Sequence, residues 1–249
     1  SNLDINTFIN QPNNILGIEY IKALMRFNSK INPVPLKRLG AGYHSLDTRT
    51  KLASATGIRT AMANKDNISG LLPDNCLNII KNHTTIEYND FSTVLGSKLL
   101  SMDTLDHIEG INQDLSNRIA NNKYNFTDIE TFIPMLQSKN YTYSAISRAL
   151  LHIILDIKTD DIKEFISNNY VNYAMILGFN KNTGVLSEIS KSTKIPLVSK
   201  FATFYKEADN NQRKMLDINL KADNLYRMIY MNKTSETLPT EFQRQIIIK

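Results

Sequence analysis

Apolar residues at helical spacing dominate this 249-residue chain from Pro73 onward and limit it to a mainly α fold. A helix with one buried face carries apolar residues three and four positions apart. This spacing occurs in four long stretches, and each predicts a helix packed into a core. Their apolar faces are Phe91, Val94, Leu95 and Leu99; Ile129, Phe132, Ile133 and Leu136; Ile146, Leu150, Ile153 and Ile154; and Met215, Ile218, Ala222, Leu225 and Ile229.

Capping residues indicate where two of these helices begin. Thr127 and Glu130 have the spacing of a capping box, in which each side chain accepts a hydrogen bond from the backbone of the other residue. Thr142 stands in front of the third stripe, where a hydroxyl can accept the free N–H groups of a first turn. We therefore expect helix starts near both positions.

A short stretch of the second half has the pattern of a strand. Residues 170–179 alternate between apolar and polar side chains and lead into an Asn- and Gly-containing turn at 180–184. Residues 195–198 can supply a partner strand. The sequence thus predicts a helical region over residues 66–249 with a small α+β element near 170–200.

The first 65 residues follow a different pattern. Asn13 and Asn14 stand before an apolar-periodic stretch at 16–27, which predicts an Asn-capped helix. Two prolines exclude helix from 31–39, which we interpret as an extended segment and a possible edge strand. A further helix, capped by a hydroxyl, follows from Ser54 through Met62. This order is one unit of an α/β domain, with too few strands for a sheet of its own.

Composition excludes several classes of protein. Cys76 is the only cysteine, so a disulfide framework and a cysteine-based zinc site are excluded, and the four histidines are too scattered for a metal motif. We expect no metal site formed by protein side chains alone. No apolar run reaches the length of a membrane span, since even 149–157 is interrupted by His152 and Asp156. A cytoplasmic protein fits these features.

Positive charge is concentrated at the beginning of the chain. The first 65 residues contain nine Lys and Arg against three Asp and Glu, whereas the remainder contains twenty against twenty-one. A basic segment of this kind attracts phosphates, whether of a nucleotide or of nucleic acid. The alternative is an ordinary solvated basic face.

The helix predicted to start after Ser54 has the chemistry of a phosphate site. A helix N-terminus offers free N–H groups and the positive end of the helix dipole. Ser54 and Thr56 add hydroxyl donors, and Arg59 can supply a forked guanidinium one turn further on. Arg38 ends the extended segment, where strand-end residues of open α/β sheets face a ligand crevice. Each feature alone would equally fit a capped helix or a surface arginine.

These segments resemble those of a known family. Residues 53–59, Ala-Ser-Ala-Thr-Gly-Ile-Arg, resemble the Ser-Ser-Thr-x-Ile-Arg motif of nucleotidyltransferases that also carry a His-x-Gly-His motif, with Ala55 at the second serine. Residues 12–24 and 37–44 resemble segments of the tRNA(Met) cytidine acetate ligase family. So do the later segments 141–155 and 177–180, so the resemblance runs along most of the chain.

The resemblance implies a fold, a reaction and a set of binding residues. The fold would be mainly α: a remnant of an α/β nucleotidyltransferase domain at 1–65, followed by a helical, tRNA-binding body and the small α+β region. Such ligases use ATP to activate acetate as acetyl-adenylate and acetylate N4 of the wobble cytidine of elongator tRNA(Met). ATP, with Mg²⁺, and acetate would be substrates. The residues that would bind ATP are Asn13, Arg38, Leu39, Ser54, Thr56 and Arg59.

One departure from the family concerns the catalytic histidines. No His-x-Gly-His occurs in the sequence, since His44 is followed by Ser45, Leu46 and Asp47. The family carries that motif in an N-terminal segment, so we expect this chain to correspond to the C-terminal portion. The catalytic residues are therefore not assigned, and this polypeptide is expected not to form acetyl-adenylate.

Candidate tRNA contacts lie on and before the helix that starts after Thr142. Arg148 and His152 are four residues apart and share a face opposite the apolar stripe. Lys139 and Tyr141 could add a phosphate contact and aromatic stacking. The alternative is structural: a half-buried packing tyrosine and a hydrogen-bonded surface histidine.

Two other functions fit parts of the sequence. A small-molecule nucleotidyltransferase would use the same phosphate chemistry, but it needs little more than an α/β domain, and the long helical body argues against it. A non-catalytic RNA-binding module is favoured by the absent histidine motif.

Overall fold

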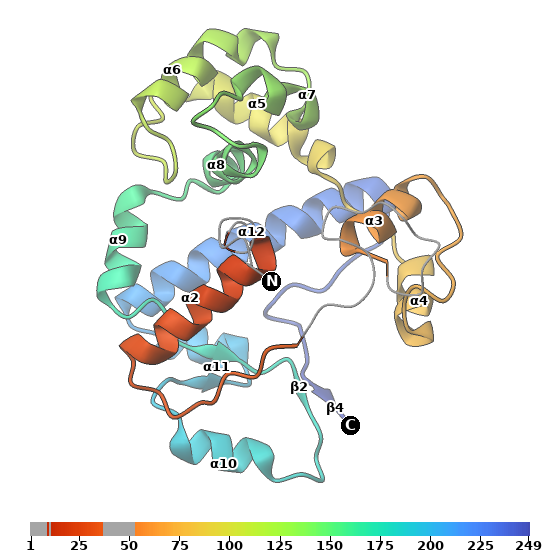
Figure 1. Cartoon of the computed structure of the whole chain (residues 1–249), viewed down its shortest axis with the longest axis vertical. Coiled ribbons are helices and arrows are strands. Elements are labelled where there is room, and N and C mark those ends of the chain that lie inside the picture. The colour runs from red at the N-terminus through yellow and green to blue at the C-terminus, as the bar shows by residue number, and fades with distance from the viewer. Residues whose placement is uncertain (1–8, 10, 37–52) are drawn as a thin grey trace, which may run out of the picture. The chain divides into compact units, whose positions relative to one another are not determined.

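The computed structural model describes residues 9, 11–36 and 53–249, which form two compact units divided between His83 and Thr84 (Figure 1). The described chain is mainly helical, and its few strands are each two residues long. This confirms the predicted fold class. The proposed functional boundary at residue 65 stays a prediction.

The first unit contains three described helices: α2 (Pro12–Arg26), α3 (Ala55–Ala63) and α4 (Asp74–Lys81). The helix predicted near 16–27 is present as α2, but the expected asparagine cap is wrong. Gln11 is the N-cap, and no side chain caps the helix. Pro12 at the first helical position explains the earlier start, because it lacks the N–H that a cap would satisfy and its φ already suits a helix.

The extended segment after α2 does not form a strand in its described part. Residues 29–36 are irregular, and 37–39 lie outside the described residues. Pro33 and Pro35 lack the N–H groups that a ladder requires, so an edge strand here would have few hydrogen bonds to offer. The edge-strand interpretation is therefore wrong for 31–36.

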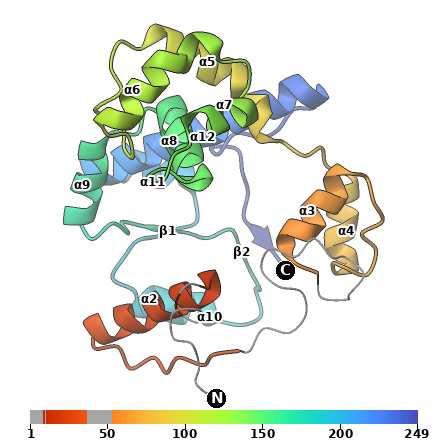
Figure 2. The same cartoon turned by 45° about the horizontal axis from the view of Figure 1, so that its top comes forward.

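The second unit is built around a group of helices that follows a short 3-10 turn, η1 (Tyr88–Phe91). They are α5 (Ser92–Ser101), α6 (Gln113–Asn122), α7 (Ile129–Leu136) and α8 (Tyr143–Leu155), with η2 (Lys123–Asn125) between α6 and α7. Figures 1 and 2 show α8 between the α5–α7 group and the long helix α12 (Asn210–Thr234). α8 contacts α5, α7 and α12.

The core of this unit consists mainly of the first three apolar faces that the sequence predicted, whereas of the fourth, on α12, only Ile229 is buried and Leu225 packs against the core. All of the second stripe and all of the third are buried, and Leu95 and Leu99 of the first stripe join them. Phe91 and Val94 pack against this core while remaining partly exposed. Loop residues complete it, because Leu105, Ile108 and Ile111 from the segment between α5 and α6 are also buried.

Caps define the starts of three of these helices. Thr142 caps α8 as predicted, its hydroxyl accepting from the N–H of Ala145. Asn112 caps α6 by accepting from Leu115. The capping box expected at Thr127 is wrong, because Asp128 caps α7 and accepts from the N–H of Thr131 at 2.9 Å.

α12 connects distant parts of the second unit. It contacts α8 and α9 (Thr159–Ser167). Lys214 near its start reaches Asp161 on α9 at 2.6 Å, and Lys233 near its end reaches Asp90 in η1 at 2.7 Å. With 25 residues and a rise of about 1.5 Å per residue, α12 spans the unit.

The small α+β element forms where it was predicted. β1 (Ala174–Met175) pairs in parallel with β3 (Leu197–Val198), so the predicted partner for the first strand is confirmed. β2 (Gly178–Phe179) pairs in parallel with β4 (Ile247–Ile248). Two helices complete the element: α10 (Val185–Ser192) and α11 (Phe201–Glu207).

The buried hydroxyl of Ser92 gives a test of the packing between α5 and α7. It accepts the N–H of Ile129 at 3.1 Å, one of the donors that α7 cannot satisfy internally. Ser92→Ala should lower the free energy of unfolding by about 1–3 kcal/mol, because that buried N–H loses its acceptor. Chemical denaturation measures the change. Thr93→Ala, on the exposed side of the same helix, is the matched control, and equal stability of the two variants would contradict the assignment.

Candidate functional site

The N-cap and the first two turns of α3 carry three of the predicted nucleotide-binding residues, Ser54, Thr56 and Arg59. Ser54 is its N-cap, with the hydroxyl accepting from the N–H of Gly57 at 2.9 Å, and the residue is only 1% exposed. The predicted cap is thus confirmed. Because its hydroxyl is buried and bonded to the backbone, the main role of Ser54 is to stabilise the first turn of α3.

Thr56 and Arg59 are the members of the set that face solvent. Both are exposed. Arg59 lies in the second turn of α3, and no ion pair joins it to a described residue. The first turn contains no acidic residue. This arrangement suits a phosphate group, because it offers N–H groups, a hydroxyl and a guanidinium, and the first turn has no carboxylate to repel the phosphate.

The other three predicted residues are not brought to α3 by any described contact. Asn13 is exposed in the first turn of α2. Arg38 and Leu39 lie outside the described residues. Their place in a nucleotide site stays a prediction.

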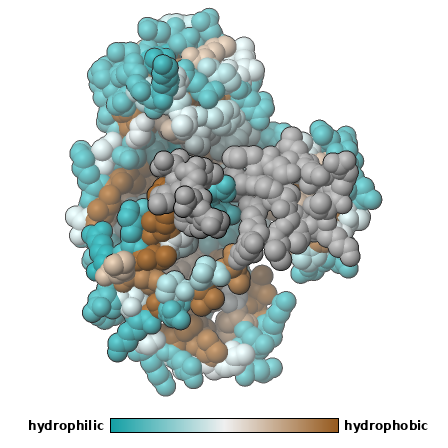
Figure 3. Space-filling view, in the orientation of Figure 1, coloured by the Kyte–Doolittle hydropathy of each residue, from teal (hydrophilic) through white to brown (hydrophobic). Residues whose placement is uncertain are grey.

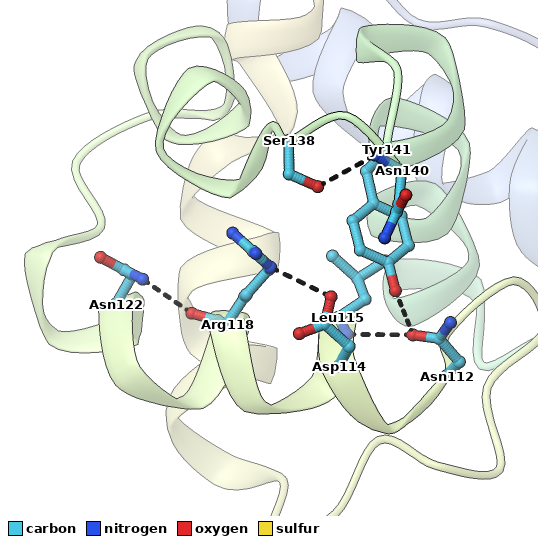
Figure 4. A network of polar contacts seen from close by, with 8 residues as sticks. All are labelled: Asn112, Asp114, Leu115, Arg118, Asn122, Ser138, Asn140 and Tyr141. Atoms are coloured by element: carbon cyan, nitrogen blue, oxygen red, sulfur yellow. Dashed lines mark hydrogen bonds and ion pairs between the residues drawn. The ribbon is translucent and has the colours of Figure 1, made fainter.

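Tyr141, a predicted tRNA contact, lies in a polar network before α8 (Figure 4). Its hydroxyl donates to the side-chain oxygen of Asn112 at 2.5 Å, the same oxygen that caps α6. The backbones of Tyr141 and Ser138 also pair with one another. Tyr141 is half-buried. These contacts favour the structural interpretation, in which Tyr141 joins the loop before α8 to the start of α6.

His152 is also held by a partner from elsewhere in the sequence. Its Nδ1–H donates to the backbone carbonyl of Glu109 at 2.7 Å. Because a carbonyl can only accept, the neutral imidazole keeps its proton on Nδ1, and Nε2 is left as the acceptor. The neighbouring Gly110 has φ of 81°, a conformation that favours glycine. Glu109 and Gly110 are typical of a break between helices, but no sequence pattern indicates that His152 packs against them.

Arg148 and Lys139 remain available for a ligand. Both are exposed, and neither forms an ion pair with a described residue. The structure therefore separates the four candidates: two free cations, and two side chains already engaged in the fold. An RNA role for the set stays a prediction.

Positive charge also gathers at the C-terminal end of α8. Lys221 of α12 donates to the carbonyl of Leu155 at 2.6 Å, where the last carbonyls of a helix lack internal partners. Burial lowers the pKa of Lys221, and the nearby charges of Lys98 and Lys158 lower it further, although Asp156 opposes the shift. We interpret this cluster as a cap for the helix end, where Asp156 is the C-cap in a left-handed conformation.

The described residues contain neither a candidate metal site nor a candidate membrane-spanning helix. Their His, Cys, Asp and Glu side chains include no group of three or more placed to hold a metal ion. None of their helices combines the length and the apolar character needed to cross a membrane.

The fold is that of a protein of known structure. TmcAL from Thermotoga maritima, solved both without ligand and with alpha-thio ATP, superposes with a TM-score of 0.83 at 22% identity. The match covers 97% of this chain and 62% of the ligand-free TmcAL chain. At this identity the likeness shows the fold.

Sequence comparison identifies the family. Residues 2–241 match the family described as HIGH Nucleotidyl Transferase, and the chain belongs to it. Two relatives named tRNA(Met) cytidine acetate ligase are those of Thermoanaerobacter sp., 31% identical over 94% of this chain, and of Caldanaerobacter subterraneus subsp. tengcongensis, 34% identical over 92%. The chain spans 59% and 58% of their lengths. The resemblance drawn from the motifs is confirmed.

Replacement of the engaged His152 and of the exposed Arg148 should affect stability differently. His152→Ala should lower the free energy of unfolding by about 1–3 kcal/mol, because the half-buried carbonyl of Glu109 loses its donor. Arg148→Ala, four residues earlier on the same helix, should change it by less than about 0.5 kcal/mol. Urea denaturation of both variants measures the difference. A destabilised Arg148→Ala beside an unchanged His152→Ala would reverse the assignment.

Proposed function

We propose that this protein serves the ATP-dependent acetylation of N4 of the wobble cytidine in elongator tRNA(Met), with acetate activated as acetyl-adenylate. The observation that carries the proposal is the start of α3, where a buried capping serine supports a turn with exposed Thr56 and Arg59. Support comes from membership of the HIGH nucleotidyl transferase family and from relatives named for this reaction. The T. maritima TmcAL structure with alpha-thio ATP supports ATP as the nucleotide.

The residues of α3 fit the phosphates of ATP. The N–H groups of the first turn and the positive end of the helix dipole would face the phosphate oxygens, and Arg59 would neutralise part of their charge. Arg38 would add a second guanidinium. Mg²⁺ would accompany ATP on its phosphate oxygens, because the first turn of α3 supplies no carboxylate for the metal. Cytoplasmic location follows from tRNA as substrate.

Nucleotide binding can be tested in this chain directly. Arg59→Ala and Arg38→Ala should each weaken ATP binding by about ten- to a hundredfold, the effect of losing a charged hydrogen bond of about 1.5–3 kcal/mol. Isothermal titration with ATP measures the affinities, and melting curves should show both variants folded.

Lys65→Ala is the matched control, since Lys65 is an exposed cation that follows the end of α3. Unchanged ATP affinity in both arginine variants would sink the nucleotide assignment. Equal weakening in the control would indicate a diffuse charge effect instead of a site.

Catalysis by this chain alone is a separate expectation. We expect no acetate-dependent conversion of ATP to AMP and pyrophosphate, because the 249 residues contain no His-x-Gly-His. That absence also favours the second candidate function, an RNA-binding module without catalysis. Pyrophosphate release with acetate present measures the reaction, and release above that seen without acetate would contradict the expectation.

A further inference from the structure

A second basic surface lies in the small α+β element, where the overall charge balance hides it. Residues 180–206 contain five lysines and a single acidic residue, Glu188. All five lysines are exposed, and none forms an ion pair with a described residue. Elsewhere in the same unit Lys163, Lys214 and Lys233 each have a carboxylate partner. The five are Lys181, Lys191, Lys194, Lys200 and Lys206.

Two open hollows lie where this segment begins, one beside Lys181 and the other beside Lys249. One, of about 400 Å³, is lined by Lys181, residues of α10 and the ring of Phe179. The other, of about 380 Å³, is lined by Lys249, residues of β2 and β4 and the same Phe179. Volumes of this size accommodate a small ligand or one nucleotide. The backbone N–H of Lys181 donates to the carbonyl of Lys249 at 2.8 Å, so the two hollows adjoin.

The floor between the hollows is apolar. Phe179 is half-buried between them, while Val185, Ile189 and Ile247 are exposed nearby on α10 and β4. Figure 3 shows apolar surface with hydrophilic residues around it at the lower end of the view, where Figure 1 places α10. An aromatic ring flanked by free cations is the combination that single-stranded nucleic acid requires: a platform for a base and charges for its phosphates.

We propose that this surface, defined by Phe179, Lys181, Lys191, Lys194 and Lys249, binds a single-stranded segment of RNA. A base stacks on Phe179, and Lys181 before α10, Lys191 on its last turn and Lys194 just after it contact successive phosphates along about 12 Å, the length of an eight-residue helix. That the RNA is tRNA rests on the proposed function. The surface itself rests on charge and geometry alone.

The charge of the surface favours RNA over a second copy of this chain as its partner. A second copy of the chain would bring the same unpaired lysines to the interface, and like charges facing each other oppose association. RNA brings one negative charge per nucleotide and releases counterions when lysines replace them. The RNA interpretation is therefore the one that uses every feature of the surface.

The test is a salt titration of RNA binding by the full chain. The triple variant Lys181→Gln, Lys191→Gln, Lys194→Gln is compared with unmodified protein on an elongator tRNA(Met) transcript and on a single-stranded RNA of about twelve nucleotides. Near 100 mM salt the affinity should fall about tenfold or more, and the slope of log Kd against log salt should drop by about 2, since three phosphate contacts are lost.

A matched triple variant controls for net charge. Lys81, Lys123 and Lys163 are three exposed or half-exposed lysines outside the surface, and changing them to Gln removes the same charge. Full-strength RNA binding by this control, with melting temperatures equal across the set, is the expected result. An equal loss in both triple variants, or none in either, would overturn the proposal. So would a change in sedimentation mass without a change in RNA affinity, which would mark a contact between copies.

A separate experiment tests whether a base stacks on the ring of Phe179. Phe179→Leu should weaken binding of the short RNA by about tenfold through lost stacking. Cross-linking of RNA containing 4-thiouridine to unmodified protein should label the peptide that includes Phe179, which tests the site even if the variant unfolds. Labelling confined to other peptides contradicts the proposal.

Failure of this inference can be told from failure of the proposed function. ATP binding that depends on Arg59, with RNA affinity independent of the α10 lysines, would leave the function standing and remove this surface. Lysine-dependent RNA binding without any ATP binding would do the reverse.

Discussion

Burial of one face of α8 is the interaction on which the second unit depends. Ile146, Leu150 and Ile153 are fully buried, and each such side chain contributes about 1.5–3 kcal/mol relative to an exposed position. Helices α5, α7 and α12 all contact α8, so its apolar face is the surface that they share. The polar face of the same helix is thereby left to contacts with loops and solvent, which is why His152 and Arg148 have such different surroundings.

Charged contacts then fix where α12 lies without adding much stability. Lys214 has its pKa raised by hydrogen bonds to Asp161 and Glu164 on α9. Burial alone would raise the pKa of Asp90, but the N–H of Glu87 and the ammonium of Lys233 hold it below its usual value. Pairs as exposed as those of Lys214 contribute little free energy. Their effect is on the position of α12 along its own axis, because each end of the helix has a specific partner.

The helices could be predicted because burial imposes its period on the sequence directly. Every residue of the stripes led by Ile129 and Ile146 is buried, and the start of α8 at Thr142 was marked by its hydroxyl. The start of α7 was misplaced by one residue because Thr127 and Asp128 can both cap, and only the backbone conformation selects the aspartate. The prolines of the extended segment were interpreted as tolerable at an edge, whereas the described part has no strand.

The residue types of the candidate sites could be predicted from the sequence, but the hydrogen-bond partners of these residues could not. A capped helix with Thr56 and Arg59 can be read from seven consecutive letters, because all its members lie within two turns. Tyr141 and His152 are held by Asn112 and Glu109, which lie 29 and 43 residues away in sequence. No pattern of neighbouring residues predicts a contact over such a sequence distance. The net charge counted over residues 66–249 is close to zero and therefore conceals the lysines around α10, which a count over a shorter segment shows.

The pairing of β2 with β4 has a consequence for how the chain folds. Gly178 lies opposite Ile247, about seventy residues further on, and α10, α11 and α12 lie between them. Closing so long a loop costs entropy before a two-residue ladder returns any hydrogen bonds, whereas α5 to α8 meet through short connections. The helical core should therefore form first and the β2–β4 ladder last, and amide hydrogens of that ladder should exchange with solvent well before those of α8.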